Sequence, residues 1–422
     1  MGTPTTILGP QHKSFPPASW GQPVRKFLDN AVELSQFQTP VLTLNRPALE
    51  HNTATMMTWA RQVGLSLAPH GKTTMAPALW QQLLDAGAWG LTLATPWQAQ
   101  VARAAGCRRI LIANTVVDPV GLTWLAHERA AHPDVDLLCW ADSPATVMEM
   151  DTILAAAGAE QRVPVLAELG ADGGRTGARG LTKAVGLATM IASSHHLELA
   201  GVGGYEGALA HDRSDASLTR IDTYLDELRA LHFNVRGLVR ADTRPIVTAG
   251  GSAYFDRVAA RLSGLRDTDV VLRSGAFQIH DDGFYADITP MGRHVGETPF
   301  RSAMHAWLRV ISRPEPGLAL LDGGKRDLSF DEGLPTPQRI AGRSAVESQR
   351  ILADSRITAL NDQHAFLELA PGTSAEDLPV GTVLRLGLSH PCTALDKWRL
   401  IPVIEDADQP HPRVTDAIET IF

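Results

Sequence analysis

A lysine follows a short apolar run in the stretch LAPHGKTTMAP, residues 67–77. Lys72 comes directly after residues that resemble a buried strand, and a lysine there is placed for chemistry if the strand belongs to a barrel. Burial lowers the pKa of such a lysine and frees its amine to form a Schiff base with a carbonyl group. The alternative is an ordinary surface lysine at the start of a helix.

A second stretch, TAGGSAYFD, has the residue types of a phosphate site and also follows an apolar run. Gly250 and Gly251 let the backbone approach an anion closely, Ser252 adds a hydroxyl, and a following helix presents free N–H groups. Ordinary tight turns have the same pattern. A lysine and a phosphate site on one face together fit pyridoxal phosphate, whose aldehyde and phosphate lie at opposite ends of one ring. We therefore predict cofactor contacts at Thr248, Gly250, Gly251 and Ser252.

A third stretch, LSHPCTALDKW, carries a histidine and a cysteine two positions apart. On an extended chain His390 and Cys392 point to the same side. Imidazole together with thiolate favours zinc. Two protein ligands leave coordination positions open for water or substrate, which is typical of a catalytic metal. The alternative is one ordinary histidine beside a core cysteine.

Two further residues end apolar runs and are expected at the same face. Arg175 lies in the glycine-rich stretch GADGGRTGARG, and Tyr205 lies in VGGYEG. We predict that Arg175 pairs with the cofactor's phenolic oxygen and that Tyr205 hydrogen-bonds the cofactor or a substrate. Turn formation and packing are the alternative roles. The stretch GVGGYEG also resembles a dinucleotide fingerprint, but Glu206 replaces its third glycine.

The elements that must position these residues form a regular series. Short apolar runs alternate with stretches of helical periodicity, which predicts a parallel sheet buried on both faces. Eight such units predict an α/β fold with a (β/α)₈ TIM-type barrel, and an open doubly wound sheet is the alternative. The eight runs are 65–71, 90–95, 109–115, 136–142, 163–170, 199–207, 245–252 and 269–277.

The pattern differs at the two ends of the chain. A strand-like run at 39–45 and a helix over 47–63 precede the series, and past residue 285 strand-like runs are joined by loops rich in Gly, Pro and Asp. We therefore expect a cofactor-binding barrel over 46–285. Residues 1–45 and 286–422 are expected to form a mostly β domain that carries the metal pair.

Composition restricts the class of protein. The 422 residues include 44% hydrophobic and 20% charged residues, and 38 basic against 46 acidic residues give a net charge of −8. This acidic balance argues against nucleic acid or an anionic membrane as partner. Three separated cysteines, no signal-peptide pattern and no long apolar run predict a cytoplasmic protein.

Taken together, these motifs resemble the fold type III pyridoxal phosphate enzymes related to alanine racemase, and most closely the D-serine dehydratase and D-threonine aldolase family. The resemblance runs from TPVLTLNRPALEHN to VGTVLRLGLSHPCTALDKW. Family members have a Pro-His-x-Lys-Thr segment, here residues 69–73, whose lysine carries the cofactor. They also have a late His-x-Cys or His-x-Asp pair that holds a metal, here His390 and Cys392.

The sequence departs from the family pattern at three places. Thr74 stands where the family has a histidine, and the family's Glu-Glu-His-Gly segment is Asp-Gln-His-Ala here, so that only its histidine, His364, is kept. The acidic residue upstream of Arg175 is out of register, with Glu168 and Asp172 nearby. These differences concern the substrate more than the cofactor.

The resemblance implies a lyase acting on a D-amino acid, with zinc and a homodimeric assembly. Cysteine in the metal pair is the dehydratase-like form, so the sequence favours a D-serine dehydratase (deaminase) that releases pyruvate and ammonia. Lys72 is the expected cofactor lysine and catalytic base. The closest alternative is a D-threonine aldolase that gives glycine and an aldehyde. A racemase would need a second base, and a non-catalytic cofactor-binding protein would be expected to lack the metal pair.

Overall fold

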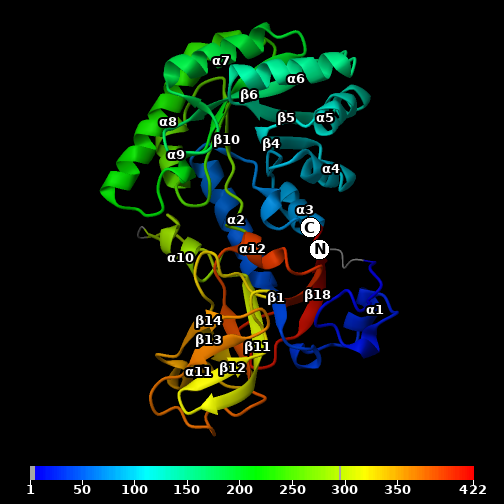
Figure 1. Ribbon diagram of the computed structural model, residues 1–422, viewed down its shortest axis with the longest axis vertical. Helices are drawn as coiled ribbons and strands as arrows, with labels where there is room; N and C mark the ends of the chain where they lie inside the picture. The colour runs from blue at the N-terminus through cyan, green and yellow to red at the C-terminus, as the bar shows by residue number, and fades with distance from the viewer. Residues whose placement is uncertain (1–4, 294–295) are drawn as a thin grey trace.

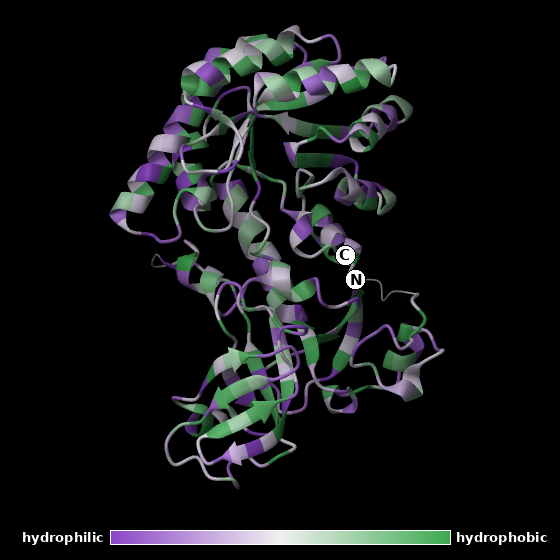
Figure 2. Cartoon of the chain, viewed as in Figure 1, coloured by the Kyte–Doolittle hydropathy of each residue, from purple (hydrophilic) through white to green (hydrophobic). Residues whose placement is uncertain are grey.

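The computed structural model describes residues 5–293 and 296–422, which form a barrel and a second, mostly β part (Figure 1). Figure 2 shows hydrophobic residues along the strands of both parts. Among the described residues, no helix has the length and apolar content that a membrane crossing requires. The domain boundaries at residues 45 and 285 stay a prediction.

Eight parallel strands form the barrel, one for each apolar run in the sequence. Along the sheet the order is β2-β10-β9-β8-β6-β5-β4-β3, and a parallel bridge between His70 and Thr92 joins its two ends. The expected fold class is therefore confirmed, and the open-sheet alternative is wrong. The strands are β2 (Ser66–Leu67), β3 (Leu91–Leu93), β4 (Arg109–Thr115), β5 (Asp136–Ala141), β6 (Val163–Gly170), β8 (Leu197–Gly204), β9 (Ile246–Ala249) and β10 (Asp269–Leu272), with β7 (Ala178–Arg179) paired to β6.

The barrel helices begin at clear start signals. Proline stands in the first turn of five of them, and the side chains of Thr95, Asp118 and Ser143 each accept a backbone N–H at a helix start. These signals end the loops after several strands, and because the strands are parallel these loops gather at one barrel mouth. The helices are α2 (Arg46–Gln62), α3 (Pro77–Asp85), α4 (Pro96–Ala104), α5 (Pro119–Ala131), α6 (Pro144–Ala156), α7 (Leu181–Ser193), α8 (Asp215–Val235) and α9 (Phe255–Leu262).

The inside of the barrel is filled by side chains. Ala68, Leu111, Trp140, Leu166 and Val271 belong to one buried cluster contributed by different strands. A filled interior leaves the mouth at the carboxyl ends of the strands as the place for a site. Short 3₁₀ turns lie around the barrel: η3 (Gly71–Thr73), η4 (Glu206–Ala208) and η5 (Arg236–Leu238).

The second sheet combines strands from both ends of the chain. Near the N-terminus, β1 (Val41–Asn45) pairs antiparallel with β11 (Met304–Glu315) and parallel with β17 (Leu400–Ile404). The other strands are β12 (Leu318–Leu321), β13 (Thr336–Ile340), β14 (Arg356–Leu360), β15 (Ala365–Glu368), β16 (Val383–Gly387) and β18 (Val414–Glu419). Of these nine strands, the sequence did not predict β13, β14, β17 and β18.

Short helices complete this part of the chain and bring it to the barrel mouth. Both α10 (Phe284–Ile288) and α12 (Pro391–Leu395) lie between the barrel and the second sheet (Figure 1). They therefore place residues of the second part opposite the barrel strand ends. The remaining elements are η1 (Pro17–Ser19), α1 (Val24–Leu28), η2 (Leu34–Gln36) and α11 (Ala345–Leu352).

Candidate active site

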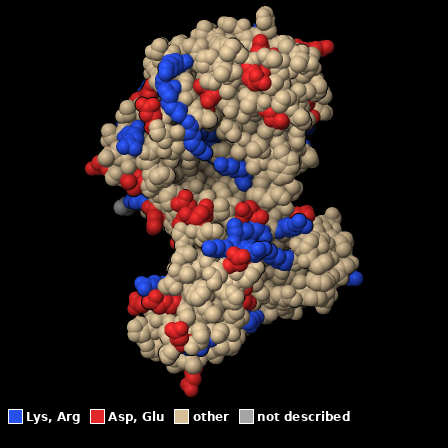
Figure 3. Space-filling view, in the orientation of Figure 1, with Lys and Arg blue, Asp and Glu red and all other residues tan. Residues whose placement is uncertain are grey.

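A cavity of about 680 Å³ lies at the barrel mouth, and residues of both parts line it. Figure 3 shows a hollow between the two parts, with Lys or Arg side chains reaching its edge. Seven of the predicted site residues line this cavity: Lys72, Arg175, Tyr205, Gly251, Ser252, His390 and Cys392. Thr248 and Gly250 do not line it and lie behind its wall. The individual roles of these residues stay predictions.

Lys72 lies in η3, directly after the first barrel strand. The preceding Gly71 is packed so closely that an added Cβ would approach Trp80 Nε1 to 2.9 Å and Leu93 Cδ2 to 3.1 Å. Trp80 Nε1 also donates to the Gly71 carbonyl at 3.0 Å. The glycine therefore lets the turn dock tightly, and this docking fixes the backbone from which Lys72 reaches the cavity.

Arg175 and Tyr205 contact each other on the cavity wall. The Arg175 guanidinium lies 4.4 Å from the centre of the Tyr205 ring. The Tyr205 backbone N–H donates to Tyr224 Oη at 3.0 Å, and that hydroxyl donates to the Leu169 carbonyl at 2.6 Å. Burial raises the pKa of Tyr205. The residues that follow β6 and β8 are thus joined, and the Arg175 cation and the neutral Tyr205 phenol lie side by side.

The Gly250–Ser252 turn already holds a carboxylate. The amides of Gly250 and Gly251 donate to Glu206 at 2.9 and 3.1 Å. Gly250 has φ +99°, a conformation that suits glycine. Ser252 lines the cavity, and its hydroxyl oxygen accepts the Ala276 N–H at 3.1 Å. The serine hydroxyl is therefore the turn's side-chain group available to a phosphate, while these two amides are committed to Glu206.

Sequence reasoning missed a buried arginine, Arg273, on the cavity wall. Arg273 Nη1 donates to Thr248 Oγ1 at 2.7 Å, and Nη2 donates to the Gly204 carbonyl at 2.6 Å. Its guanidinium also lies 4.8 Å from the centre of a Trp140 ring. The only signal in the sequence is an arginine inside the last apolar run, residues 269–277. The predicted phosphate-site residue Thr248 thus holds an arginine in this structure.

Four buried polar atoms on the cavity wall have no hydrogen-bond partner within the described residues. They are His70 Nδ1, Trp140 Nε1, Glu168 Oε2 and Arg273 Nε. Unpartnered buried polar atoms are rare in folded proteins and call for a bound molecule or water. A polar ring compound with an anionic group fits this wall, with Lys72 and Ser252 also at hand.

Glu168 has an unusual setting among these residues. Burial raises the pKa of its carboxyl group to about 7, against the opposing effect of a 2.8 Å hydrogen bond from Thr176 Oγ1. At neutral pH this group exists in both protonation states. It is one of the two acidic residues, with Asp172, that lie near Arg175 but out of register with the family pattern.

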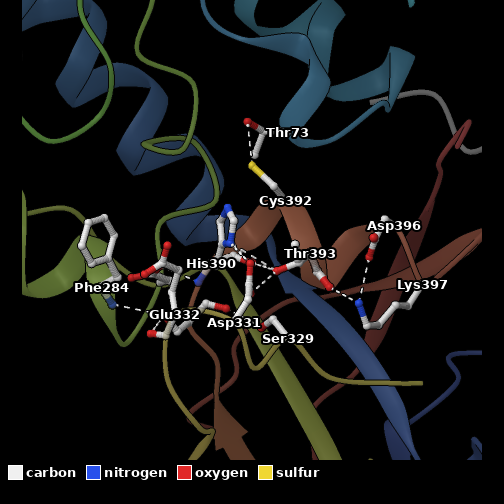
Figure 4. Close-up of polar contacts among 12 residues, drawn as sticks. Thr73, Phe284, Ser329, Asp331, Glu332, His390, Cys392, Thr393, Asp396 and Lys397 are labelled. Atoms are coloured by element: carbon white, nitrogen blue, oxygen red, sulfur yellow. Dashed lines mark hydrogen bonds and ion pairs between the residues drawn. The ribbon is translucent and has the colours of Figure 1, made fainter. Parts of the chain in front are cut away.

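His390 and Cys392 come together from the second part of the chain (Figure 4). The extended geometry assumed from the sequence is wrong, because β16 ends at Gly387 and Cys392 lies in α12. His390 instead turns the chain with φ +56°. Cys392 Sγ lies 3.5 Å from Thr73 Oγ1, beside Lys72.

His390 and Cys392 shift each other's pKa in opposite directions. Burial acts to lower the pKa of His390, but hydrogen bonding and charge attraction to Cys392, and then to Asp331, raise it to about 9. Burial acts to raise the pKa of Cys392, but His390 and Thr73 lower it. The described residues contain no group of three or more His, Cys, Asp or Glu side chains arranged for a metal. The imidazole and thiolate pair suits zinc with open positions.

The other family departures have clear positions. Thr74 is 3% exposed, and its hydroxyl has no partner among the described residues. His364 lies in the exposed turn between β14 and β15 and does not line the cavity. Thr74 is therefore buried next to Lys72 without lining the cavity, while His364 lies away from the site.

The chain is similar to known proteins over most of its length. Residues 303–404 match a family model described as "Putative serine dehydratase domain". D-threonine aldolase of Arthrobacter sp. is 27% identical over 380 residues, which cover 89% of this chain and 88% of that protein. D-threo-3-hydroxyaspartate dehydratase of Delftia sp. (strain HT23) is 26% identical over 373 residues, covering 85% and 92%. The crystal structure of D-threonine aldolase from Filomicrobium marinum superposes with a TM-score of 0.77 at 25% identity, covering 92% of this chain and 96% of that one.

Proposed function

Because the chain belongs to the alanine racemase-like family of fold type III pyridoxal phosphate enzymes, we propose that it is a metal-assisted aldolase. Its substrates are 3-hydroxy-D-amino acids of the D-threonine type, and its products are glycine and an aldehyde. The sequence alone favoured D-serine dehydration, but the similarity to a D-threonine aldolase over 89% of the chain supports cleavage better.

One observation carries the proposal. Lys72 and the His390–Cys392 pair line the same cavity, and Thr73, the neighbour of Lys72, contacts Cys392 at 3.5 Å. Groups that act on adjacent carbons of one substrate must be this near to each other. The amine would serve the α-carbon, and the metal pair would serve the hydroxyl on the β-carbon.

The residues of the barrel mouth would hold the cofactor. Pyridoxal phosphate supplies an electron sink for the bond that breaks at the α-carbon. Lys72 Nζ would bind its aldehyde carbon, Ser252 its phosphate, and Arg175 with Tyr205 the ring substituents between them. Arg273 and Glu168, each with an unpartnered buried atom, would add hydrogen-bonding groups on the same cavity wall.

The second part of the chain would act on the hydroxyl. His390 and Cys392 would hold a zinc ion, which would supply Lewis acidity toward the hydroxyl oxygen. In the net reaction the Cα–Cβ bond breaks, the hydroxyl proton leaves oxygen as the aldehyde forms, and the α-carbon gains a proton to give glycine. Lys72, once its amine is free, is the residue of this chain that we assign to proton transfer at the α-carbon.

β-Elimination is the second candidate. The cysteine at position 392, the match to a serine dehydratase domain and the similarity to a hydroxyaspartate dehydratase favour it. The same residues would then assist loss of the hydroxyl, and the products would be a keto acid and ammonia.

A substrate panel separates the two reactions. The protein, loaded with pyridoxal phosphate and zinc, is offered D-threonine, D-serine and D-threo-3-hydroxyaspartate, with L-threonine as a stereochemical control. We expect glycine and acetaldehyde from D-threonine and no reaction with the control. Keto acid and ammonia without glycine would replace the aldolase by the dehydratase. No turnover of any D-substrate would overturn both.

A further inference from the structure

The loop before β13 is fastened to the turn that carries His390. Ser329 Oγ donates to the Ser389 carbonyl, and Ser389 Oγ donates to the Glu332 carbonyl at 2.7 Å. Asp331 lies between these two attachment points (Figure 4). Its position relative to His390 is therefore fixed from both sides, although the two residues are 59 positions apart in sequence.

The His390 backbone is held in a conformation that its residue type does not favour. A left-handed φ of +56° costs a non-glycine residue about 1–2 kcal/mol. The His390 N–H donates to Asp281 Oδ2 at 2.8 Å. Asp281 Oδ1 accepts the N–H groups of Gly283, Tyr285 and Ala286, so a buried carboxylate anchors this turn to α10. Strain that the surroundings hold in place is typical of functional sites.

The imidazole ring is fixed as well. His390 Nδ1 lies 2.6 Å from Asp331 Oδ2, and the Thr393 hydroxyl donates to Asp331 Oδ1 at 2.7 Å. Thr393 Oγ1 also lies 3.3 Å from Nδ1, but the carboxylate is nearer and charged. Figure 4 shows the other side of the ring toward Cys392. The Asp331 carboxylate thus binds Nδ1 of the ring and leaves Nε2 available to a ligand on the Cys392 side.

We infer that Asp331 is a positioning residue for metal binding. Its carboxylate fixes the tautomer and direction of the His390 ring, so that Nε2 binds the metal ion beside Cys392. Metal-binding histidines typically donate their other N–H to a carboxylate, and loss of that carboxylate costs about 10- to 100-fold in metal affinity. Thr393 acts one step further out, because it holds the second oxygen of Asp331. The inference rests on the metal site of the proposed function.

The test measures Co²⁺ and Zn²⁺ affinity and the Co²⁺ absorption spectrum of the full-length protein. We expect Asp331→Asn to weaken both ions about 10- to 100-fold, while the sulfur-to-cobalt absorption of Cys392 persists at saturating Co²⁺. Thr393→Val should weaken them less, and it should have no further effect in the Asp331→Asn background. If Asp331 had a purely structural role, its substitution would alter thermal stability, and Thr393→Val would still weaken metal binding in the Asp331→Asn background.

Asp396→Asn is the matched control. Asp396 follows α12 and pairs with Lys397 at 3.2 Å, so its substitution removes the same charge nearby without touching His390. Metal affinity of Asp331→Asn equal to that of this control would overturn the inference. A loss above about a thousandfold with a changed Co²⁺ coordination spectrum would make Asp331 a ligand and would overturn it too. If His390→Ala binds metal as tightly as the unaltered protein, the metal site of the proposed function fails instead.

Discussion

The two halves of the cavity wall are held in place in different ways. On the barrel half, Lys72, Arg175 and Tyr205 follow the ends of different strands, and four buried polar atoms on this wall lack partners among the described residues. On the second half, His390 is held at its backbone N–H and at Nδ1. The barrel half has hydrogen bonds to offer a bound molecule, whereas the second half fixes one imidazole in one direction.

Lys72→Ala should have the largest effect on activity, and this effect should be confined to the barrel half of the cavity wall. Loss of the cofactor attachment and of the catalytic base should reduce kcat more than about 10³-fold. It should also abolish the visible absorbance of the bound cofactor, while Co²⁺ affinity at His390 and Cys392 stays within about twofold. Lys397→Ala, whose lysine does not line the cavity, should keep the absorbance. Persistence of that absorbance in Lys72→Ala would refute the assignment.

Glu168→Gln should change the pH dependence of stability of the cofactor-free protein. Burial raises the folded-state pKa to about 7 from an ordinary 4.5. Between these values the folded protein holds a proton that the unfolded chain has lost, so the free energy of unfolding falls as pH rises from about 4.5 to 7. The contribution is up to about 3 kcal/mol.

Urea unfolding at pH 5 and pH 8 measures this effect. Glu168→Gln should match the unaltered protein at pH 5 and be more stable at pH 8, because a neutral amide has no charge to bury. Glu160→Gln, at an exposed position, should leave the pH dependence unchanged. Equal pH dependence for the unaltered protein and Glu168→Gln would mean that the Glu168 carboxyl group is ionised at both pH values. Its unpartnered oxygen would then have to be solvated, and the assignment of a raised pKa would be wrong.

Cys392→Ser should affect the second half and spare the first. A serine oxygen is a weaker zinc ligand than a thiolate, and Lewis-acid assistance is worth several kcal/mol, so kcat should fall about 100-fold. Cofactor absorbance should stay unchanged, since Lys72 is intact. Chelation of the unaltered protein should produce a similar loss that added zinc reverses. Full activity after chelation would show that no metal takes part.

The difference between the halves also explains what the sequence could predict. The barrel strands were predictable because buried parallel strands are continuous apolar runs, and β6 is buried at every position. The strand-end rule then brought Lys72 and Arg175 to one mouth. In the second part, β13 and β17 contain a proline and β14 is mostly exposed, so these strands lack the expected pattern.

Site residues followed the same division. Arg273 was missed, and Glu168 was noted only as out of register, because a single charged residue inside an apolar run gives no motif and its burial depends on neighbouring strands. Asp331 was missed because its pairing with His390 depends on tertiary structure alone. When a residue such as His390 is held by a loop far away in the sequence, the local sequence shows no pattern that would reveal it.

The smallest effect is expected where the halves touch, at the 3.5 Å contact between Thr73 Oγ1 and Cys392 Sγ. The hydroxyl helps to lower the pKa of Cys392, and a weak hydrogen bond between a thiol and a hydroxyl is worth about 0.5–1 kcal/mol. Thr73→Val should therefore weaken Co²⁺ binding about two- to fivefold, and Thr73→Ser, which keeps the hydroxyl, should restore it. If Thr73→Val instead abolished cofactor absorbance while metal affinity held, the contact would serve the backbone of Lys72 and the halves would be independent. A change in metal affinity with intact absorbance would mean that the barrel turn carrying the lysine also tunes the thiolate that faces it.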